Sequence, residues 1–132
     1  MALSLRKADR VMSQIYNDYL SPLGLKVTQF SMLRALNYLG STTAKSMQHI
    51  LVMEQATVSR ALKPLLRDGY IIVREGEDRR EKVLSLSKSG QSLYEQALLP
   101  WGEAQMKVRK EFGANFEDNL LKLSNEIVAI KD

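Results

Sequence analysis

The sequence predicts a mostly α-helical domain with one small β-hairpin. Three observations indicate this fold class: apolar residues recur at three- and four-residue steps along most of the chain, two short β-branched runs lie close together, and a charged loop containing a glycine separates the runs. The runs are residues 70–74 and 82–86. At 132 residues the chain is long enough for one hydrophobic core, so we expect a single domain over residues 1–132.

Two helices are expected in the first third of the chain. Residues 3–20 carry an apolar stripe, which ends before Pro22 because proline disfavours helix continuation. A second helix follows, for which Thr28 is the expected N-cap and Phe30 lies on the buried side. Gly40 is expected to end this helix.

Two further helices, separated by a tight turn, follow. The first is about two turns long and begins near Thr42 or Thr43, either of which can serve as its N-cap. The second covers residues 54–68, buries valine and leucine side chains on one face and places small, polar or basic side chains on the other. Pro64 should bend this second helix to fit its core. A helix-turn-helix followed by a charged hairpin is typical of a winged helix-turn-helix, here over about residues 28–87.

The outer face of this second helix suits the B-DNA major groove in size and charge. Its first turns should contact base edges, with Arg60 reaching a guanine or a phosphate and Ala56 a thymine methyl group. Phosphate contacts, which fix register without carrying sequence information, should come from both helices. An ordinary amphipathic helix with a solvated basic face would show the same pattern. The residues expected at base edges are Gln55, Ala56, Thr57, Ser59 and Arg60, and those expected at phosphates are Thr43, Lys45 and Lys63.

Several segments together resemble the MarR (multiple antibiotic resistance regulator) family of bacterial transcription factors. Residues 24–36, 51–65 and 67–71 resemble, in order, the family's second helix, its recognition helix and the step into its wing. Val52 departs from the pattern, because relatives often place glycine or another small residue in that turn. The segment similar to the family's wing signature is Asp78-x-Arg80 followed by Val83-Leu84-Ser85-Leu86-Ser87-x-x-Gly90.

The resemblance implies that the hairpin is a wing that enters the minor groove, whose negative potential deepens where the groove is narrow. Either Arg79 or Arg80 could make this contact. The family pattern favours Arg80, with Asp78 bracing its guanidinium group and Lys82 at the base of the loop. The alternative is that Asp78 and Arg80 form a surface ion pair, worth at most about 1 kcal/mol. We expect Arg67 to pair with its acidic neighbour or to interact with the helix dipole rather than with DNA.

Two helices are expected after the hairpin. Ser87 can cap a long helix that extends to about Gly113, within which Pro100 should produce a kink or a break. A hinge at Pro100 could set the separation of two recognition helices, and we hold this as a hypothesis. Asn115, with Asp118 three residues later, resembles a capping box and should open the last helix.

The terminal helices carry more apolar surface than a winged core of this size can cover. We infer that about residues 3–20 and 88–131 are dimerisation helices that build a homodimer. Its twofold symmetry would place two recognition helices roughly 34 Å apart, so that the operator should be an inverted repeat. The alternative is that these helices pack back on their own monomer.

Composition excludes several other functions. The 19 basic and 15 acidic residues give a net charge of +4, which is compatible with a polyanionic partner but too mild to establish one. The absence of cysteine excludes disulfides, thiolate metal sites and thiol redox switches. His49 is the only histidine and has no obvious acidic partner, so we expect no catalytic residues, no metal site, no cofactor and no enzymatic activity. The sequence contains no apolar run of roughly 20 residues and no signal sequence. We therefore expect a cytoplasmic protein without a membrane partner.

The resemblance also implies regulation by a ligand. Many family members respond to small amphipathic or phenolic molecules that bind between the dimer helices and the winged domain, and repression is their commoner mode of action. Met12, Tyr16, Met32 and Trp101 could line such a cleft here, although methionine and aromatic residues at helical spacing are more often core residues. The competing interpretation is a winged-helix module for protein interaction or architecture, without sequence-specific DNA binding.

Overall fold

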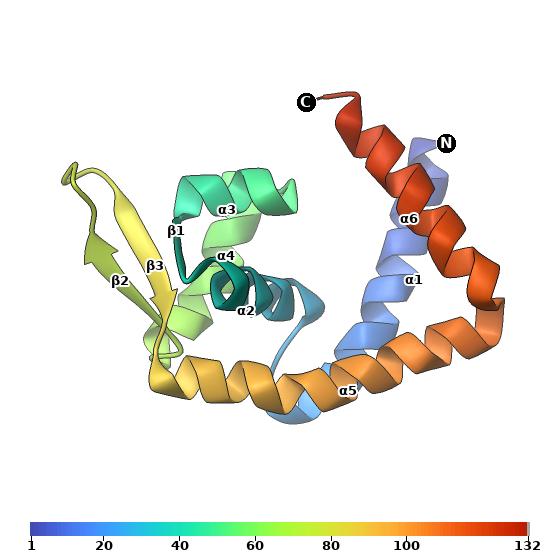
Figure 1. The fold of residues 1–132 in the computed structure, drawn as a ribbon, viewed down its shortest axis with the longest axis horizontal. Coiled ribbons are helices and arrows are strands. Elements are labelled where there is room, and N and C mark those ends of the chain that lie inside the picture. The colour runs from blue at the N-terminus through green and yellow to red at the C-terminus, as the bar shows by residue number, and fades with distance from the viewer. Residues whose placement is uncertain (132) are drawn as a thin grey trace.

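The fold is a winged helix-turn-helix joined by one long helix to a pair of terminal helices (Figure 1). The structure is a computed structural model that describes residues 1–131. The elements are α1 (Ala2–Leu20), the 3-10 turn η1 (Ser21–Leu23), α2 (Val27–Leu39), β1 (Ser41–Thr43), α3 (Ala44–Leu51), α4 (Gln55–Arg67), β2 (Ile71–Glu75), β3 (Lys82–Leu86), α5 (Lys88–Phe112) and α6 (Ala114–Ala129). The mostly α-helical fold class with a β-hairpin wing is therefore confirmed.

Helix α5 extends along one side of the molecule and links its two ends. Its first half packs beneath α2 and β3, and its second half packs against α1 and α6. The N- and C-terminal segments lie at the same end, away from the wing (Figure 1). The wing and α6 therefore lie at opposite ends of α5, while α1 contacts both α5 and α2.

The hydrophobic core lies within the winged domain and extends to the first half of α5. Phe30 of α2, Met47 of α3 and Ile71 of β2 are almost completely buried. Tyr94 of α5 stacks on Phe30 with ring centroids 5.7 Å apart, and Trp101 stacks on the same ring at 5.5 Å. These contacts hold α5 to the winged domain on both sides of its proline.

The sheet has three antiparallel strands in the order β1-β3-β2, with β2 at an edge. Strand β3 matches its expected bounds, and β2 is displaced by one residue from the expected 70–74. Strand β1 was not expected from the sequence. It pairs Thr42 with Leu84 and Thr43 with Val83, and a three-residue Ser-Thr-Thr strand has no periodicity of its own that would predict this pairing.

The helix caps are partly as expected. The Thr43 hydroxyl accepts a hydrogen bond from the Ser46 N–H at 3.0 Å and caps α3. The expected cap at Thr28 is wrong, because α2 begins earlier: the Lys26 N–H donates to Gln29 Oε1 at 3.0 Å, and the Val27 N–H donates to Asn17 Oδ1 of α1 at 2.8 Å.

The expected start of the last helix is also wrong. Helix α6 begins directly after Gly113, before Asn115, and has no side-chain cap. Gly113 has φ 85° and ψ 171°, a conformation open mainly to glycine, and it turns the chain sharply between α5 and α6. Backbone geometry at the glycine, rather than a capping side chain, therefore defines this boundary.

Two prolines lie inside helices. Pro64 lies within α4, as expected, and Pro100 lies within α5. Of the kink or break expected at Pro100, the break is absent because α5 continues from Lys88 to Phe112, and the kink stays a prediction. The stacking of Tyr94 and Trp101 on one ring supports the helix on either side of Pro100. A hinge movement there remains a hypothesis.

Candidate nucleic-acid interface

Helix α4 buries one face and exposes the other, as the sequence predicts. Val58, Leu62 and Leu65 point into the core and are at most 5% exposed. On the remaining surface Thr57 is half-buried, while Gln55, Ala56, Ser59, Arg60 and Lys63 are exposed. The helix therefore presents short polar groups together with the cations Arg60 and Lys63 to solvent.

Helix α3 places its two candidate residues at its start. Lys45 is exposed. The half-buried Thr43 hydroxyl caps α3 and also donates to Ser46 Oγ at 3.0 Å. A phosphate contact from Thr43 would therefore replace its hydrogen bond to the Ser46 hydroxyl.

The wing tip is built by backbone hydrogen bonds. The Gly76 N–H donates to the Glu81 carbonyl at 3.1 Å, and the Glu81 N–H donates to the Asp78 carbonyl at 2.9 Å. The Asp78 carboxylate accepts from the backbone N–H of Arg80 at 3.0 Å. The expectation that Asp78 braces the guanidinium group of Arg80 is therefore wrong: Asp78 shapes the turn instead.

The cations of this region are available for a ligand. Over residues 1–131 the ion pairs are Arg67 with Asp68 and Arg109 with Glu117, so that Arg60, Lys63, Arg79, Arg80 and Lys82 are all unpaired. The guanidinium group of Arg67 donates two hydrogen bonds to Asp68, at 3.0 and 3.2 Å, and thereby lowers the pKa of that carboxyl group. This pairing, expected from the sequence, leaves Arg67 outside the candidate interface.

The base of the wing is fixed to the start of α5. The Ser87 N–H donates to the Tyr70 carbonyl at 3.1 Å, and the Ser87 hydroxyl donates to the carbonyls of Gly69 and Tyr70. The same hydroxyl accepts from the Gly90 N–H at 3.0 Å. Gly90 packs so closely that an added Cβ would lie 1.9 Å from the Tyr70 carbonyl oxygen. Ser87 and Gly90 of the wing signature thus hold the wing against α5.

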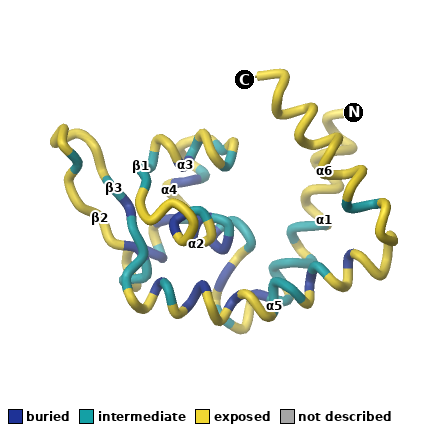
Figure 2. Tube along the Cα trace, in the orientation of Figure 1, coloured by how far each residue is buried: buried dark blue, intermediate teal, exposed yellow. Residues whose placement is uncertain are grey.

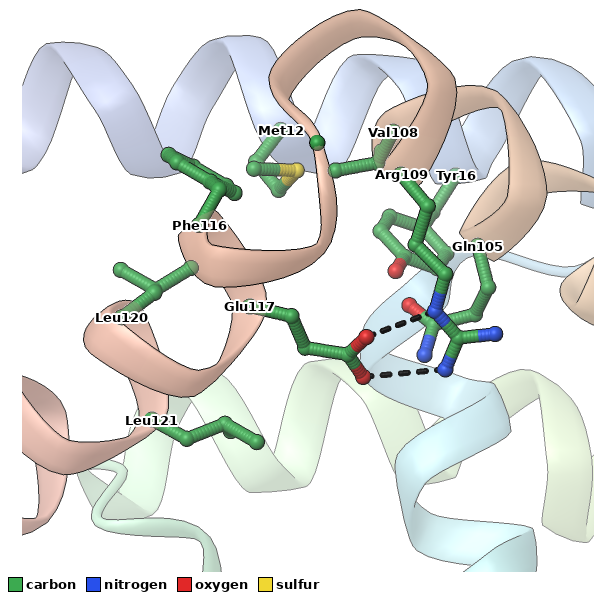
Figure 3. A pocket seen from close by; sticks show the side chains of 10 residues that line it. Met12, Tyr16, Gln105, Val108, Arg109, Phe116, Glu117, Leu120 and Leu121 are labelled. Carbon is green, nitrogen blue, oxygen red and sulfur yellow. Dashed lines mark hydrogen bonds and ion pairs between the residues drawn. The ribbon is translucent and has the colours of Figure 1, made fainter.

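The four candidate ligand-binding residues do not lie together. Met12 and Tyr16 line a hollow of about 180 Å³ between α1, α5 and α6 (Figure 3). Met32 is fully buried in the winged core and does not line this hollow. Trp101 stacks on Phe30, and the guanidinium carbon of Arg34 lies 4.9 Å from its ring centroid. The expected four-residue cleft is therefore wrong at Met32 and Trp101, where packing takes up the side chains.

The hollow beside Met12 and Tyr16 is closed on one side by an ion pair. Arg109 donates two hydrogen bonds to Glu117, at 2.6 and 3.0 Å, and so links α5 to α6 (Figure 3). The hydrogen bonds from Arg109 lower the pKa of Glu117. Burial, with a smaller contribution from the charge of Glu117, raises the pKa of the Tyr16 phenol above its ordinary value.

Sequence reasoning missed a second groove, beside the candidate recognition helix. It lies between the start of α2 and one flank of α4 and measures about 490 Å³. Lys26, Thr28 and Gln29 are polar residues close together in the chain, but their proximity to α4 follows only from the fold. The lining residues are Gly24, Lys26, Thr28, Gln29, Thr57, Arg60, Ala61 and Pro64.

Metal-binding clusters and membrane-spanning helices are absent from the part of the chain that the structure describes. Residues 1–131 hold no group of three or more His, Asp or Glu side chains that could bind a metal ion. His49 is exposed on the surface of α3. Among the same residues, no helix combines the length and the hydropathy needed to cross a bilayer.

Comparison with known proteins defines the family. The MarR family pattern matches residues 25–82. An uncharacterised HTH-type transcriptional regulator of Bacillus subtilis, YwoH, is 32% identical over 114 residues, which cover 86% of this chain and 80% of that protein. The chain belongs to the MarR family of transcriptional regulators. The resemblance on which this family was suggested is thereby confirmed, as is the interpretation that the chain is a regulator rather than an enzyme.

Further MarR-family proteins extend the comparison. The multiple antibiotic resistance protein MarR of Salmonella typhimurium is 30% identical over 92 residues, and this match spans 61% of its length. A mutant MarR from E. coli complexed with operator DNA shares the fold with a TM-score of 0.84 at 20% identity, over 96% of this chain and 91% of that one. The M. tuberculosis transcriptional regulator MosR in complex with DNA has a TM-score of 0.84 at 27% identity, over 100% of this chain and 98% of that one.

Proposed function

We propose that this MarR-family regulator is a sequence-specific, homodimeric repressor that binds an inverted-repeat operator in double-stranded DNA. The observation that carries the proposal is the set of exposed, unpaired cations on the outer face of α4 and on the wing. A helix with small and polar residues between such cations fits the major groove, and a cationic wing fits the adjacent minor groove. MarR and MosR are each known in complex with DNA, which supports the same partner for this chain.

The exposure of each side chain supports assigning it to a particular part of the DNA. We assign base contacts to the first turns of α4, with Arg60 as the guanine or phosphate contact. Phosphate contacts would come from Lys45, Lys63 and Thr43, whose hydroxyl would donate to a phosphate in place of Ser46 Oγ while it still caps α3. Arg80, or its neighbour Arg79, would enter the minor groove, with Lys82 at the base of the loop; Asp78 only shapes the turn. The complete set of proposed contact residues is Thr43, Lys45, Gln55, Ala56, Thr57, Ser59, Arg60, Lys63, Arg79, Arg80 and Lys82, and Asp78 joins the site only as the residue that shapes the wing turn.

The proposed homodimer rests on the surface of the terminal helices. No residue of α6 is buried within its own chain (Figure 2), although α6 carries a stripe of large apolar side chains. Leu121 is 54% exposed, Leu123 52% and Ile130 80%. Exposed apolar surface of this kind marks interaction sites. We therefore assign about residues 28–87 to DNA binding, and about residues 3–20 and 88–131 to dimerisation.

We further propose that a small amphipathic or phenolic ligand relieves the repression. The hollow beside Met12 and Tyr16 is lined mainly by apolar side chains and lies between three helices of the proposed dimerisation region (Figure 3). A ligand there can shift operator affinity only by its differential affinity for the DNA-competent arrangement of the two recognition helices. Its binding would therefore act through the angle between α5 and α6.

The test is selection of bound sequences from a randomised duplex pool at near-physiological salt. Enrichment of an inverted repeat, together with a solution mass of twice 15.0 kDa, is the expected result. On the selected operator, Arg60→Ala should cost roughly 1–3 kcal/mol and relax the preference at one base position, as loss of a base contact does. Arg80→Ala should instead weaken binding across many sequences and flatten its salt dependence.

Two results would contradict the proposal. An equal loss for Arg60→Ala on operator and random duplex would mean that Arg60 makes no base contact, which removes the support that Arg60 gives to sequence-specific binding. Weak, salt-insensitive binding without sequence enrichment would favour the competing function, a winged-helix module that recognises another protein.

A further inference from the structure

The groove between α2 and α4 lies beside the proposed recognition surface. Thr57 and Arg60 of α4 form one wall, and Lys26 and Thr28 at the start of α2 form the other. Arg60 is also part of the exposed face of α4, so the groove continues directly from that face. A molecule bound against the outer face of α4 could therefore enter this groove.

The chemistry of the groove favours an anion. Its charged lining residues are Lys26 and Arg60, and no acidic side chain lines it. Neither cation has an ion-pair partner among the described residues. The hydroxyl groups of Thr28 and Thr57, both half-buried, also make no hydrogen bond within residues 1–131. Two unpaired cations and two unused hydroxyl donors match the acceptor-rich surface of a phosphate.

The groove is held in shape by a buried amide. Gln29 is 9% exposed; its Oε1 accepts from the Lys26 N–H at 3.0 Å, and its Nε2 donates to the Ala61 carbonyl at 3.4 Å. This side chain therefore connects the start of α2, where Lys26 lies, to the middle of α4. Pro64, which has no N–H to donate, lines the groove next to this connection. The two walls are consequently fixed relative to each other before any ligand binds.

We propose that this groove holds one DNA phosphate per subunit, bound by Lys26 of α2, with Arg60 of α4 beside it. An α-helix about 10–12 Å in diameter fills a major groove about 12 Å wide, so the sugar-phosphate backbone passes along the flanks of the helix. Lys26 and Thr28 border such a flank, whereas base edges face the outer side of α4. This phosphate contact rests on the proposed DNA-binding function and adds the start of α2 to the surface that contacts DNA.

Lys26 should have a different role from the residues on the outer face of α4. A phosphate contact carries no base information, but it fixes the register of α4 in the major groove. Because Arg60 borders both the groove and the exposed face, a phosphate held beside it would also restrict the guanidinium group. Lys26 should accordingly contribute to affinity on every sequence, and the Arg60 base contact should depend on it at the operator.

The first test is the salt dependence of binding to a random-sequence duplex, compared between the wild-type chain and Lys26→Gln. Loss of one phosphate contact should reduce the slope of log K against log salt by about 0.9. Over a fourfold rise in salt, the variant should then lose about 3.5-fold less affinity than the wild-type chain. Lys26→Arg should retain the wild-type slope. Lys107→Gln, which makes the same charge change on α5 at a different hollow, is the matched control and should leave the slope unchanged.

The second test locates the phosphate. Single methylphosphonate substitutions along the selected operator remove one backbone charge at a time. One position per half-site, beside the bases contacted by α4, should weaken binding of the wild-type chain and have no further effect on Lys26→Gln. This loss of additivity identifies the DNA phosphate as the groove's ligand, because a free anion would give no position dependence.

The results of these tests distinguish failure of the Lys26 phosphate contact from failure of the proposed DNA-binding function. If Lys26→Gln keeps the wild-type slope while Arg80→Ala reduces it, the groove does not hold a phosphate, although the chain still binds DNA through α4 and the wing. A flat slope for the wild-type chain itself would overturn both proposals.

Discussion

The contact between Gly90 of α5 and the end of the wing makes a sharp prediction about stability. A Cβ atom at Gly90 would lie 1.9 Å from the Tyr70 carbonyl oxygen and 2.9 Å from its carbon. Real Cβ atoms essentially never approach a heavy atom within 3.0 Å, and here the obstacle is backbone. Gly90→Ala must therefore move the start of α5 by about 1 Å away from the strand end.

This displacement acts on the hydrogen bonds that join the wing to α5. The Tyr70 carbonyl accepts from the Ser87 N–H and the Ser87 hydroxyl, and that hydroxyl also caps α5. Overpacking costs about 1–3 kcal/mol, and loss of an N-cap costs about 1 kcal/mol. We expect Gly90→Ala to lower the free energy of unfolding by about 3 kcal/mol, near the upper end of the overpacking range.

The assay is urea denaturation followed by circular dichroism at one fixed protein concentration, since the stability of a dimer depends on concentration. With a slope of about 2 kcal/mol per molar urea, a loss of 3 kcal/mol lowers the midpoint by about 1.5 M. Gly102→Ala is the matched control on the same helix, because an added Cβ at Gly102 meets nothing within 4 Å. It should stabilise the chain by about 0.5–1 kcal/mol, the usual advantage of alanine over glycine in a helix.

The geometry requires that Gly90→Ala lowers the free energy of unfolding and that Gly102→Ala raises it. If Gly90→Ala leaves the midpoint unchanged or raises it, the close approach between α5 and the strand end does not exist in solution, and the account of the wing anchor fails.

Two further predictions concern the turn before α4 and the link between α5 and α6. Val52 is 68% exposed and has φ 52° and ψ 54°, which is a left-handed conformation. Val52→Gly should relieve this strain and stabilise the chain by about 1 kcal/mol, as measured by urea denaturation. Val52→Ala keeps the Cβ atom and should stabilise the chain less. The lowered pKa of Glu117 means that its ion pair with Arg109 contributes stability above the ordinary carboxyl pKa of about 4.5 and loses it as pH falls through the lower folded-state value. Thermal unfolding should accordingly show Glu117→Gln less stable than the wild-type chain at pH 7, with the difference vanishing toward pH 3; a difference independent of pH would refute this role.

Local sequence patterns predict most of the helices because each helix buries an apolar face and ends at a recognisable residue. The spacing of Val58, Leu62 and Leu65 defines the buried face of α4, and Thr43 supplies an acceptor for the first turn of α3. These effects act within one or two helical turns, so no distant contact is needed to anticipate them.

Cap positions and loop details are predicted less well because neighbouring elements compete for the same hydrogen bonds. Asn17 of α1 and Gln29 of α2 satisfy the N–H groups at the start of α2, so Thr28 is not needed as a cap. In the wing, the backbone N–H of Arg80 takes the Asp78 carboxylate that the sequence assigned to the guanidinium group. A side chain within reach of several donors can be assigned only when the backbone path is known.

The sequence by itself determined the helix-turn-helix, the hairpin, the family and the candidate cations of α4 and the wing, because each depends on residues close together in the chain. Only the tertiary structure decided which residues share a surface. It packed Trp101 on Phe30 and buried Met32, separating both from Met12 and Tyr16, and it brought Lys26 beside Arg60, 34 positions later in the chain. Such contacts depend on how the helices cross, which is set by the joint packing of the core rather than by any local pattern.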